Sequence, residues 1–552
     1  MPTKYLFISG GVISGLGKGI TASSIALLLK AAGYKVAPIK ADPYLNHDAG
    51  TMNPIIHGET FVTEDGLETD QDLGHYERFI NEDLSRLNYM TAGQVYLSVI
   101  ERERRLEYDG ICVETIPHIP REIINRLKLL AEKNKADFVI LEIGGTAGEY
   151  QNAMFLEAAR ELALKNKNDV LNIHVAYLPL PPSLGELKSK PVQTSVQLLH
   201  MAGIQPDIII GRAVKEIDRS RKEKIATFCS IGIEDIFSNP DMPSIYQVPE
   251  HLEKQGITDR ILGKIGLTRK SGDLAKWKQF TQKIIGVKRK LKIGIIGKYF
   301  RSGDFSLEDS YVCVMEAVKQ ACWWQDIMPE ITWIDSMDVE KKGEREILSG
   351  FDGLIVPQGW GSRGIEGKIA TAGFARKNRI PYLGLCFGMQ LATIEFARNV
   401  CGLEGANTEE VNPNTKYPVI HIMPNQKEYL AKRQYGATMR LGAWPCVIKK
   451  NTKIYAAYDK WSKKGLNTIY HLPKIEERHR HRFEFNNKYR KQFEDKGMIF
   501  SGVSPDGLLI EAVEIADHPF FIGTQFHPEF KARPLNPHPL FLEFISTCIS
   551  GK

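Results

Sequence analysis

The sequence has 552 residues, of which 43% are hydrophobic and 25% charged, as in soluble globular proteins with two or more domains. The formal net charge of +6 is small and both signs are mixed along the chain, which argues against a nucleic-acid partner. Every apolar run falls well short of the roughly 18 residues of a membrane span, so we expect no membrane partner.

The start of the chain and its cysteines favour a cytoplasmic protein. The apolar part of residues 4–8 is too short for a signal peptide, and a glycine loop follows directly. Eight cysteines are scattered without metal-type spacing, which suits reduced thiols rather than disulfides. The one dense basic run, Arg-His-Arg-His-Arg at 478–482, is short and lacks flanking aromatic residues on both sides. We therefore expect it to serve a local anionic ligand.

The N-terminal part predicts a parallel α/β sheet. A glycine loop at residues 9–19 leads into a helical pattern at 20–32, which Gly33 closes. Strand, loop, helix and strand in this order open a parallel sheet. The segments that read as strands are residues 4–8, 36–39, 137–143 and 207–210.

Residues 10–21 (GGVISGLGKGIT) can cradle phosphates through successive backbone N–H groups, with Lys18 adding a positive charge. The loop departs from the standard phosphate-binding pattern, because Val12 replaces a glycine and Gly19 replaces the hydroxyl residue after the lysine. A metal ion would need other ligands, and Asp72 and Glu142 are candidates for magnesium. A glycine-rich turn without a ligand, with two solvated acids, is the alternative.

Residues 268–290 are polar and lysine-rich, with apolar residues at helical spacing around Trp277 and Phe280, which predicts a linker containing a short helix. A second α/β pattern begins at Leu291 and ends with a helix near residues 541–549. We therefore expect one domain at 1–267, a linker at 268–290 and a second domain at 291–552.

A cysteine follows an apolar strand at 380–385 and precedes a helical pattern at 389–400, the layout of a nucleophile elbow. Gly384 and Gly388 let the backbone pass close to the Cys386 thiol. The helix N-terminus favours the thiolate.

Downstream, His527 and Glu529 supply a base for this cysteine and a carboxylate to orient the base. A buried cysteine and an ordinary surface histidine are the alternative. The pairing resembles class I glutamine amidotransferases, which hydrolyse glutamine and pass ammonia to a partner site.

Motifs along the whole chain then resemble the CTP synthase family. In the N-terminal part they include Lys40-Ala-Asp-Pro-Tyr, Gly50-Thr-Met-Asn-Pro, His57-Gly-Glu, Val62-Thr-Glu-Asp-Gly, Asp72-Leu-Gly-His-Tyr-Glu-Arg, Ile116-Pro-His-Ile, Glu142-Ile-Gly-Gly-Thr and Gly185-Glu-Leu-Lys. In the C-terminal part they include residues 351–366, the Cys386 elbow, Thr438-Met-Arg-Leu-Gly, Glu477-Arg-His-Arg-His-Arg-Phe-Glu and the His527 motif.

The resemblance implies a P-loop-like parallel-sheet synthetase domain followed by a class I glutamine amidotransferase domain. ATP would phosphorylate O4 of UTP, and glutamine-derived ammonia, channelled within the protein, would displace the phosphate to give CTP. The family also implies Mg²⁺, activation by GTP, inhibition by CTP and a homotetramer whose UTP site is built at subunit contacts.

The resemblance also assigns site residues. The catalytic set comprises Cys386, His527, Glu529, Lys18 and Lys40, with Asp72 and Glu142 as metal ligands. The ATP site comprises Ser14, Gly15, Leu16, Gly17, Lys18, Gly19, Ile20, Asp72, Arg212, Asp241 and Met242. The UTP site, which overlaps the CTP site, comprises Ser14, Glu149, Tyr150, Gln151, Lys188, Ser189, Lys190, Pro191, Val192, Gln193 and Lys224. The glutamine pocket comprises Gly359, Phe387, Gly388, Met389, Gln390, Glu410 and Arg482.

Three positions depart from the family pattern. The oxyanion loop, usually Pro-Gly-Gly-Phe-Gly, reads Pro-Gln-Gly-Trp-Gly at residues 357–361. The nucleotide triplet, usually Asp-Ile-Glu, reads Glu-Tyr-Gln at 149–151, and Pro240 stands where a lysine is familiar. We expect none of them to remove a group required for turnover.

Two other functions remain to be weighed. A cobyrinate-type amidotransferase would share the N-terminal fold and a glutaminase domain, but residues 188–193 and Lys224 argue against it. A filament-forming homologue without turnover is disfavoured because the catalytic set is retained. An absorbance assay with UTP, ATP, magnesium and glutamine would separate all three.

Overall fold

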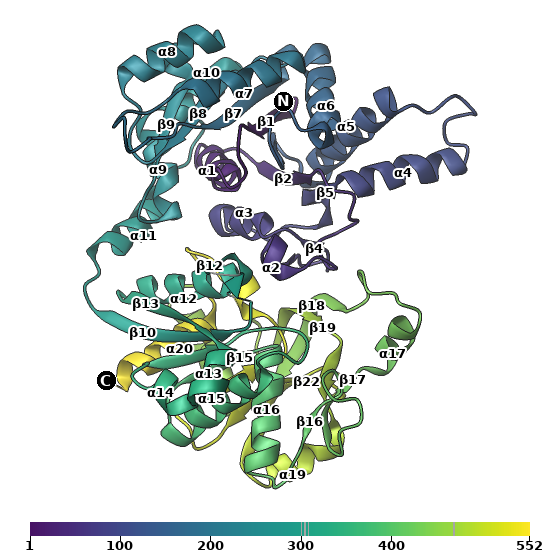
Figure 1. The fold of residues 1–552 in the computed structure, drawn as a ribbon, viewed down its shortest axis with the longest axis vertical. Helices are drawn as coiled ribbons and strands as arrows, with labels where there is room; N and C mark the ends of the chain where they lie inside the picture. Colours follow the sequence, from purple (N-terminus) through teal and green to yellow (C-terminus); the bar gives the residue numbers. More distant parts are fainter. Residues whose placement is uncertain (300, 303–304, 307, 467–469, 552) are drawn as a thin grey trace. The chain divides into compact units, whose positions relative to one another are not determined.

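The chain forms two compact units in a computed structural model that describes residues 1–299, 301–302, 305–306, 308–466 and 470–551 (Figure 1). The first unit comprises residues 1–48 and 72–281, and the second comprises residues 49–71 and 282–552. Within the described residues, no helix is long and apolar enough to cross a membrane.

A sheet with parallel neighbours throughout forms the centre of the first unit. Its strands, in spatial order, are β5 (Tyr89–Thr91), β2 (Val36–Asp42), β6 (Phe138–Ile143), β1 (Lys4–Gly10), β7 (Val170–Tyr177), β8 (Ile208–Ala213) and β9 (Ile236–Pro240). All residues of β1 and β6 are buried, as expected for parallel strands covered on both faces. The prediction of a parallel α/β sheet is therefore confirmed.

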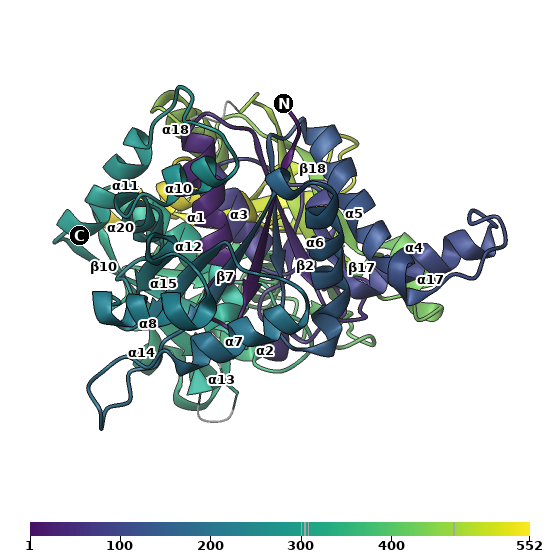
Figure 2. The ribbon, with the colours of Figure 1, turned by 90° about the horizontal axis from the view of Figure 1, so that it is seen from above.

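Helices cover both faces of this sheet (Figure 2). Tyr5 and Phe7 of β1 share a core cluster with residues of α5 and α6, while α1 packs from the other side. The helices include α1 (Lys18–Ala31), α3 (Asp72–Ile80), α4 (Ala92–Arg104), α5 (Thr115–Asn134), α6 (Ala153–Lys165), α7 (Lys190–Met201), α8 (Arg219–Cys229), α9 (Val248–Lys254), α10 (Ile257–Lys264) and α11 (Ala275–Gly286).

The short helix expected in the linker is α11. Its Trp277 is buried, donates a hydrogen bond to the Tyr246 carbonyl at 2.9 Å, and packs on Phe79 and Phe280. This part of the linker therefore contributes to the core of the first unit.

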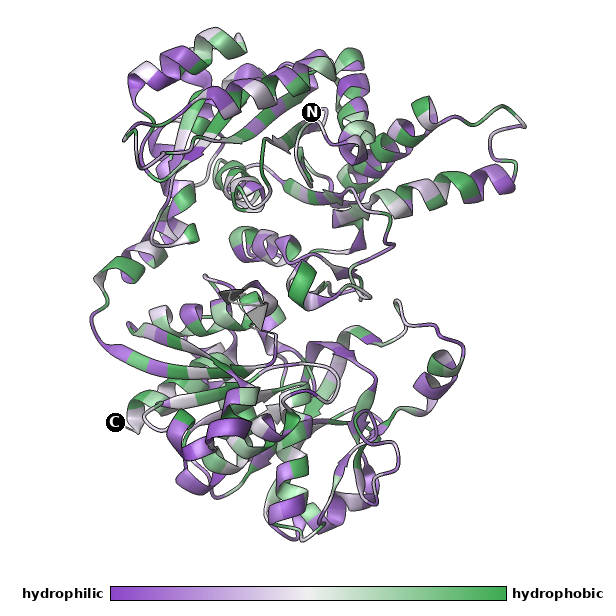
Figure 3. Ribbon diagram, in the orientation of Figure 1, coloured by the Kyte–Doolittle hydropathy of each residue, from purple (hydrophilic) through white to green (hydrophobic). Residues whose placement is uncertain are grey.

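A mixed sheet forms the centre of the second unit. In spatial order its strands are β13 (Met328–Asp335), β10 (Lys290–Gly297), β14 (Gly353–Val356), β15 (Tyr382–Leu385), β23 (Phe521–Thr524), β22 (Ile510–Ile515), β21 (Met498–Val503), β18 (Arg440–Ile448) and β19 (Lys474–His481). Neighbours run parallel from β13 to β23 and antiparallel beyond it. The central strands β14 and β15 are hydrophobic, whereas β19 is rich in charged residues and the outer helices carry hydrophilic faces (Figure 3).

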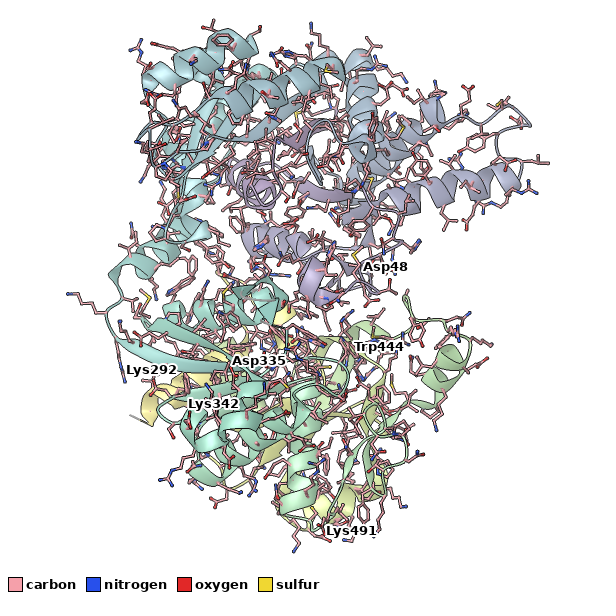
Figure 4. The ribbon with its side chains drawn as sticks, viewed as in Figure 1. Asp48, Lys292, Asp335, Lys342, Trp444 and Lys491 are labelled. Atoms are coloured by element: carbon pink, nitrogen blue, oxygen red, sulfur yellow. The ribbon has the colours of Figure 1, made fainter. Side chains whose placement is uncertain are left out.

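Shorter elements complete the second unit. Its helices include α2 (Pro54–His57), α12 (Val312–Trp324), α13 (Ser336–Lys342), α14 (Glu344–Leu348), α15 (Ile365–Asn378), α16 (Phe387–Asn399), α17 (Pro424–Ala431), α18 (Lys453–Lys463), α19 (Arg490–Glu494) and α20 (Pro539–Ser550). Small strands are β3 (Phe61–Val62), β4 (Glu68–Thr69), β11 (Arg301–Ser302), β12 (Phe305–Ser306), β16 (Asn407–Thr408), β17 (Pro418–Ile422) and β20 (Phe483–Phe485). Asp335, labelled in Figure 4, ends β13 and caps α13 by accepting the Met337 N–H at 2.9 Å.

Candidate active sites

The glycine loop of the first unit leads from β1 into the N-terminus of α1. Val12 adopts a φ of 67°, a strained conformation for a β-branched residue, and Gly17 has a φ of 79°. A side chain at Gly10 would collide with Lys18, since its Cβ would lie 2.6 Å from Lys18 Cδ. The loop therefore packs closely against the Lys18 side chain. The first turn of α1 carries no acidic residue that would repel a bound anion.

Lys18 is buried, and its ammonium donates a hydrogen bond to the Gly145 carbonyl at 2.8 Å. Burial lowers its pKa, while the nearby Glu142 carboxylate opposes this change. A bound anion would further favour the charged form of this buried amine.

The two predicted metal ligands flank Lys40. Its ammonium donates to Glu142 at 3.0 Å and also to Asp72, and the Tyr76 hydroxyl donates to Glu142. Burial raises the pKa of Glu142, whereas Lys40 holds the pKa of Asp72 below its usual value although burial opposes this effect.

The structure explains why Gly19 stands where the standard phosphate loop has a hydroxyl residue. A Cβ at this position would lie 2.2 Å from Asp72 Oδ1, so the carboxylate fills the space of a side chain there. Two carboxylates fit a magnesium ion. The described residues contain no group of three or more His, Cys, Asp or Glu that could hold a metal ion.

The predicted adenine-side residues gather around Arg212 on β8. Its guanidinium donates to the carbonyls of Leu16, at 3.2 Å, and Pro240, at 3.0 Å, and to the Asp241 carboxylate at 2.8 Å. The arginine thus joins the phosphate loop to the segment after β9. The half-buried Met242 follows directly, and Ser14, Gly15 and Ile20 lie in the loop and the first turn of α1.

The predicted UTP residues lie in three segments. Glu149 accepts from the Thr146 hydroxyl at 2.6 Å, whereas Tyr150 and Gln151 are exposed. Ser189 and residues 190–193 form the N-cap and start of α7, so the expected proline turn is the first turn of a helix. Lys188 pairs with Glu186, and Lys224 is exposed on α8. Glu186 also pairs with Arg221 of α8, which links the second segment to the helix that carries Lys224.

The strand–elbow–helix at Cys386 is confirmed by β15 and α16. Cys386 adopts a φ of 51°, the strained conformation of a nucleophile at a sharp turn. A Cβ at Gly388 would lie 1.9 Å from the Val356 carbonyl oxygen, and one at Gly384 would lie 2.8 Å from the Gly388 carbonyl carbon. Both positions therefore require glycine.

His527 and Glu529 lie beside the elbow, and both are buried. His527 Nδ1 and Glu529 Oε1 are 2.7 Å apart. Burial would lower the pKa of His527, but the Glu529 carboxylate and Cys386 raise it to about 10. Because Nδ1 faces Glu529 and Cys386 also raises the pKa, Nε2 is the ring nitrogen that can exchange a proton with the thiol.

Gln525 was not predicted to belong to the site, although it stands two residues before His527. Its amide donates to Cys386 Sγ at 3.5 Å, and its carbonyl oxygen accepts from the Gln390 amide at 3.1 Å. Gln390 is thereby oriented beside the nucleophile, while Met389 is buried in the core of the second unit.

The loop at residues 357–361 is held by several side chains. Lys298 donates to the Gly361 carbonyl at 2.7 Å, and the Gly361 N–H donates to Glu410 at 2.7 Å. Burial lowers the pKa of Lys298 to about 8 and raises that of Glu410. A Cβ at Gly359 would lie 2.7 Å from Lys298 Cδ, so a larger residue there would displace the Lys298 side chain.

A cavity of about 660 Å³ lies beside this loop and includes Glu410 and Arg482 in its lining. Arg482 donates to the Gln426 carbonyl oxygen at 2.5 Å and to the Tyr435 carbonyl. These contacts hold the guanidinium at the cavity, where it can receive a carboxylate.

The structure differs from the expectation that the basic run at 478–482 serves an anionic ligand. In β19 alternate residues face opposite sides. Arg478 pairs with Glu64 at 2.7 Å and Arg480 pairs with Glu68 at 2.8 Å, so two of the three arginines are neutralised by carboxylates of this chain.

Two family models match the sequence. The model described as CTP synthase N-terminus matches residues 4–267, and the model described as glutamine amidotransferase class-I matches residues 306–547.

Individual relatives cover the same length. A CTP synthase of Caldanaerobacter subterraneus is 47% identical over 550 residues, which are 100% of this chain and 99% of the relative. A CTP synthase of Carboxydothermus hydrogenoformans is 49% identical over 550 residues, which are 99% of each chain. A solved structure described as the glutaminase domain of Trypanosoma brucei CTPS with bound acivicin is 32% identical. That match covers 47% of this chain and 94% of the solved chain, with a TM-score of 0.41.

Proposed function

The chain belongs to the CTP synthase family, and from this premise we propose that it converts UTP to CTP with glutamine as nitrogen donor. It acts as an ATP-dependent carbon–nitrogen ligase of pyrimidine biosynthesis. The observation that carries this proposal is the Cys386–His527–Glu529 arrangement in a chain with full-length CTP synthase relatives.

In the first unit, ATP phosphorylates O4 of UTP, because an unmodified oxygen of the uracil ring is a poor leaving group. Lys18 lies under the phosphate loop and Lys40 lies between two carboxylates, so both can neutralise charge on the transferred phosphoryl group. A magnesium ion held by Asp72 and Glu142 would supply further neutralisation of the phosphates.

In the second unit, Cys386 attacks the side-chain amide of glutamine. His527 takes the thiol proton at Nε2 and delivers it to the leaving ammonia, while Glu529 holds the ring through Nδ1. Backbone N–H groups near Gly359 and Phe387 stabilise the oxyanion, and water then releases glutamate from the thioester. Arg482 and Glu410 bind the carboxylate and ammonium of the substrate.

The nitrogen must reach the activated UTP as unprotonated ammonia, so we propose that it is transferred inside the protein. The family resemblance supports GTP as an activator, CTP as an inhibitor, a homotetramer and a cytoplasmic location. These four properties stay proposals for this chain.

The test is the absorbance change on incubation with UTP, ATP, magnesium and either glutamine or ammonium chloride. We expect CTP formation with both nitrogen sources. Glutamine hydrolysis without CTP formation would favour the cobyrinate-type alternative, and no turnover of either kind would favour the filament-forming homologue.

A further inference from the structure

The oxyanion loop contains a residue that the family pattern does not, Gln358 in place of glycine. The loop follows β14, whose Val356 pairs with Gly384 of β15. Because this register is parallel, the loop after β14 and the elbow at Cys386 lie at the same edge of the sheet. Neither Gln358 nor Gly359 adopts a positive φ, and their N–H groups have no acceptor in the described part of the chain.

Lys368 on α15 holds the carbonyl groups of this loop. Its side chain is fully buried, and Nζ donates to the Pro357 carbonyl at 2.8 Å and to the Gln358 carbonyl at 3.2 Å. The Tyr311 hydroxyl donates to the same Gln358 carbonyl at 3.3 Å. A lysine has enough N–H groups for both carbonyls whether its amine is charged or neutral.

These contacts also fix the direction of the N–H groups. In a planar trans peptide the C=O and the following N–H point in opposite directions. A Pro357 carbonyl turned toward Lys368 therefore directs the Gln358 N–H away from it. The Gln358 carbonyl also points toward Lys368, so the Gly359 N–H points away from Lys368.

The Gln358 side chain is anchored separately. Its amide donates to Glu59 Oε1 at 2.8 Å, and Glu59 Oε2 accepts the Cys313 N–H at 2.7 Å. Glu59 is buried, and burial raises the pKa of its carboxyl group to about 7. The amide nitrogen of Gln358 is thus held by Glu59, while Oε1 of Gln358 is buried without a hydrogen-bond partner among the described residues.

We propose that Lys368 is a positioning residue for the oxyanion hole, which orients the N–H groups of Gln358 and Gly359 toward the tetrahedral intermediate on Cys386. The proposal rests on the proposed glutaminase activity. Lys368 orients these N–H groups by holding two successive peptide carbonyls.

The test compares wild type with Lys368→Met, which keeps the length of the side chain and removes its donors. Loss of an oxyanion donor typically costs roughly 100- to 1000-fold in kcat, and misdirection of such donors should cost about 10- to 100-fold. We expect this loss in kcat for glutamine hydrolysis with a change in KM below about threefold, because Arg482 and Glu410 are untouched.

Two probes of Cys386 separate positioning from other effects. An aldehyde analogue of glutamine forms a tetrahedral adduct with the thiol, and its affinity should fall by the same factor as kcat. Alkylation by iodoacetamide forms no oxyanion, and its rate should stay unchanged. Unchanged kcat, or alkylation that falls in parallel with kcat, would overturn the proposal.

Two further variants keep the test decisive. Arg376→Met, on the same helix, breaks an ion pair with Glu395 away from the loop and should leave kcat and analogue affinity unchanged in folded protein. If Lys368→Met fails to fold, Tyr311→Phe removes the other donor to Gln358 and should lower kcat severalfold at constant KM. An unchanged kcat in that variant would also contradict the proposal.

If wild type itself hydrolyses no glutamine, the proposed function fails instead.

Discussion

His527 and His174 show how neighbours decide the charge of a buried histidine. Burial and the positive charge of Lys18 lower the pKa of His174 to about 3, and its ring nitrogens lie 2.9 Å from the hydroxyls of Ser9 and Ser195. His527 is equally buried, yet Glu529 and Cys386 raise its pKa to about 10. The first ring is therefore neutral at pH 7 and the second is charged beside its cysteine.

The raised pKa of His527 predicts a pH-dependent contribution to stability. Because its pKa of about 10 when folded exceeds the value of about 6.5 expected when unfolded, protonation stabilises the folded state. This contribution is complete below pH 6.5 and is lost as the pH rises to about 10. The difference in free energy of unfolding between wild type and His527→Gln, from urea titrations, should therefore shrink over this range. A constant difference would contradict the raised pKa.

Gln151 predicts weaker feedback by CTP than an Asp-Ile-Glu triplet would give. A hydrogen bond to a charged group contributes about 1.5–3 kcal/mol and one to a neutral group about 0.5–1.5 kcal/mol, so the amide should cost on the order of 1 kcal/mol, or roughly fivefold in affinity. Gln151→Glu should therefore tighten CTP inhibition severalfold and change UTP affinity less. Inhibition constants measured at fixed UTP check this, and an unchanged value would show that Gln151 does not contact the nucleotide.

At the scale of elements, the sequence predicted those strands whose apolar run is uninterrupted. β1, β2, β6 and β8 were recognised this way, whereas β7 was missed because Asn172 and His174 break its pattern. Asn172 is only half-buried, whereas the buried His174 has its ring nitrogens beside the hydroxyls of Ser9 and Ser195. Polar residues in a buried strand are recognisable only once their partners are known.

The residues of the candidate site also differ in whether the sequence could predict them. Cys386, His527 and Glu529 belong to motifs in which residue type and spacing carry the chemistry. Lys368 and Glu59 could not be predicted, because such residues are usually solvated and their burial here depends on distant partners. Lys368 is one of two lysines in α15, and the sequence gives no sign that sets it apart from Lys377.

The phosphate loop and α1 predict the effect of Lys18→Ala. In the proposed reaction Lys18 acts on the phosphates before nitrogen enters, so CTP formation from ammonia and from glutamine should both fall, by roughly 100- to 1000-fold. Steady-state rates with each nitrogen source measure this. Ammonia-dependent turnover near the wild-type rate would show that Lys18 is not catalytic.

At the scale of the whole molecule, the proposed chemistry is divided between the two units, with UTP activation in the first and glutamine hydrolysis in the second. Cys386→Ala should therefore abolish CTP formation from glutamine and leave formation from added ammonia near the wild-type rate. Parallel assays with both nitrogen sources measure this. A folded variant that has lost both activities would contradict the division.

The assignment of residues 49–71 to the second unit has a practical consequence for inhibitor discovery. Gly50, Thr51, Met52 and Pro54 line the cavity next to Arg482, and Glu59 anchors the oxyanion loop. A recombinant fragment that begins at Leu291 lacks both the residues within 50–54 that line the cavity and Glu59, which binds Gln358. Compounds selected against such a fragment would be optimised for a more open pocket, so screening should use the full-length polypeptide.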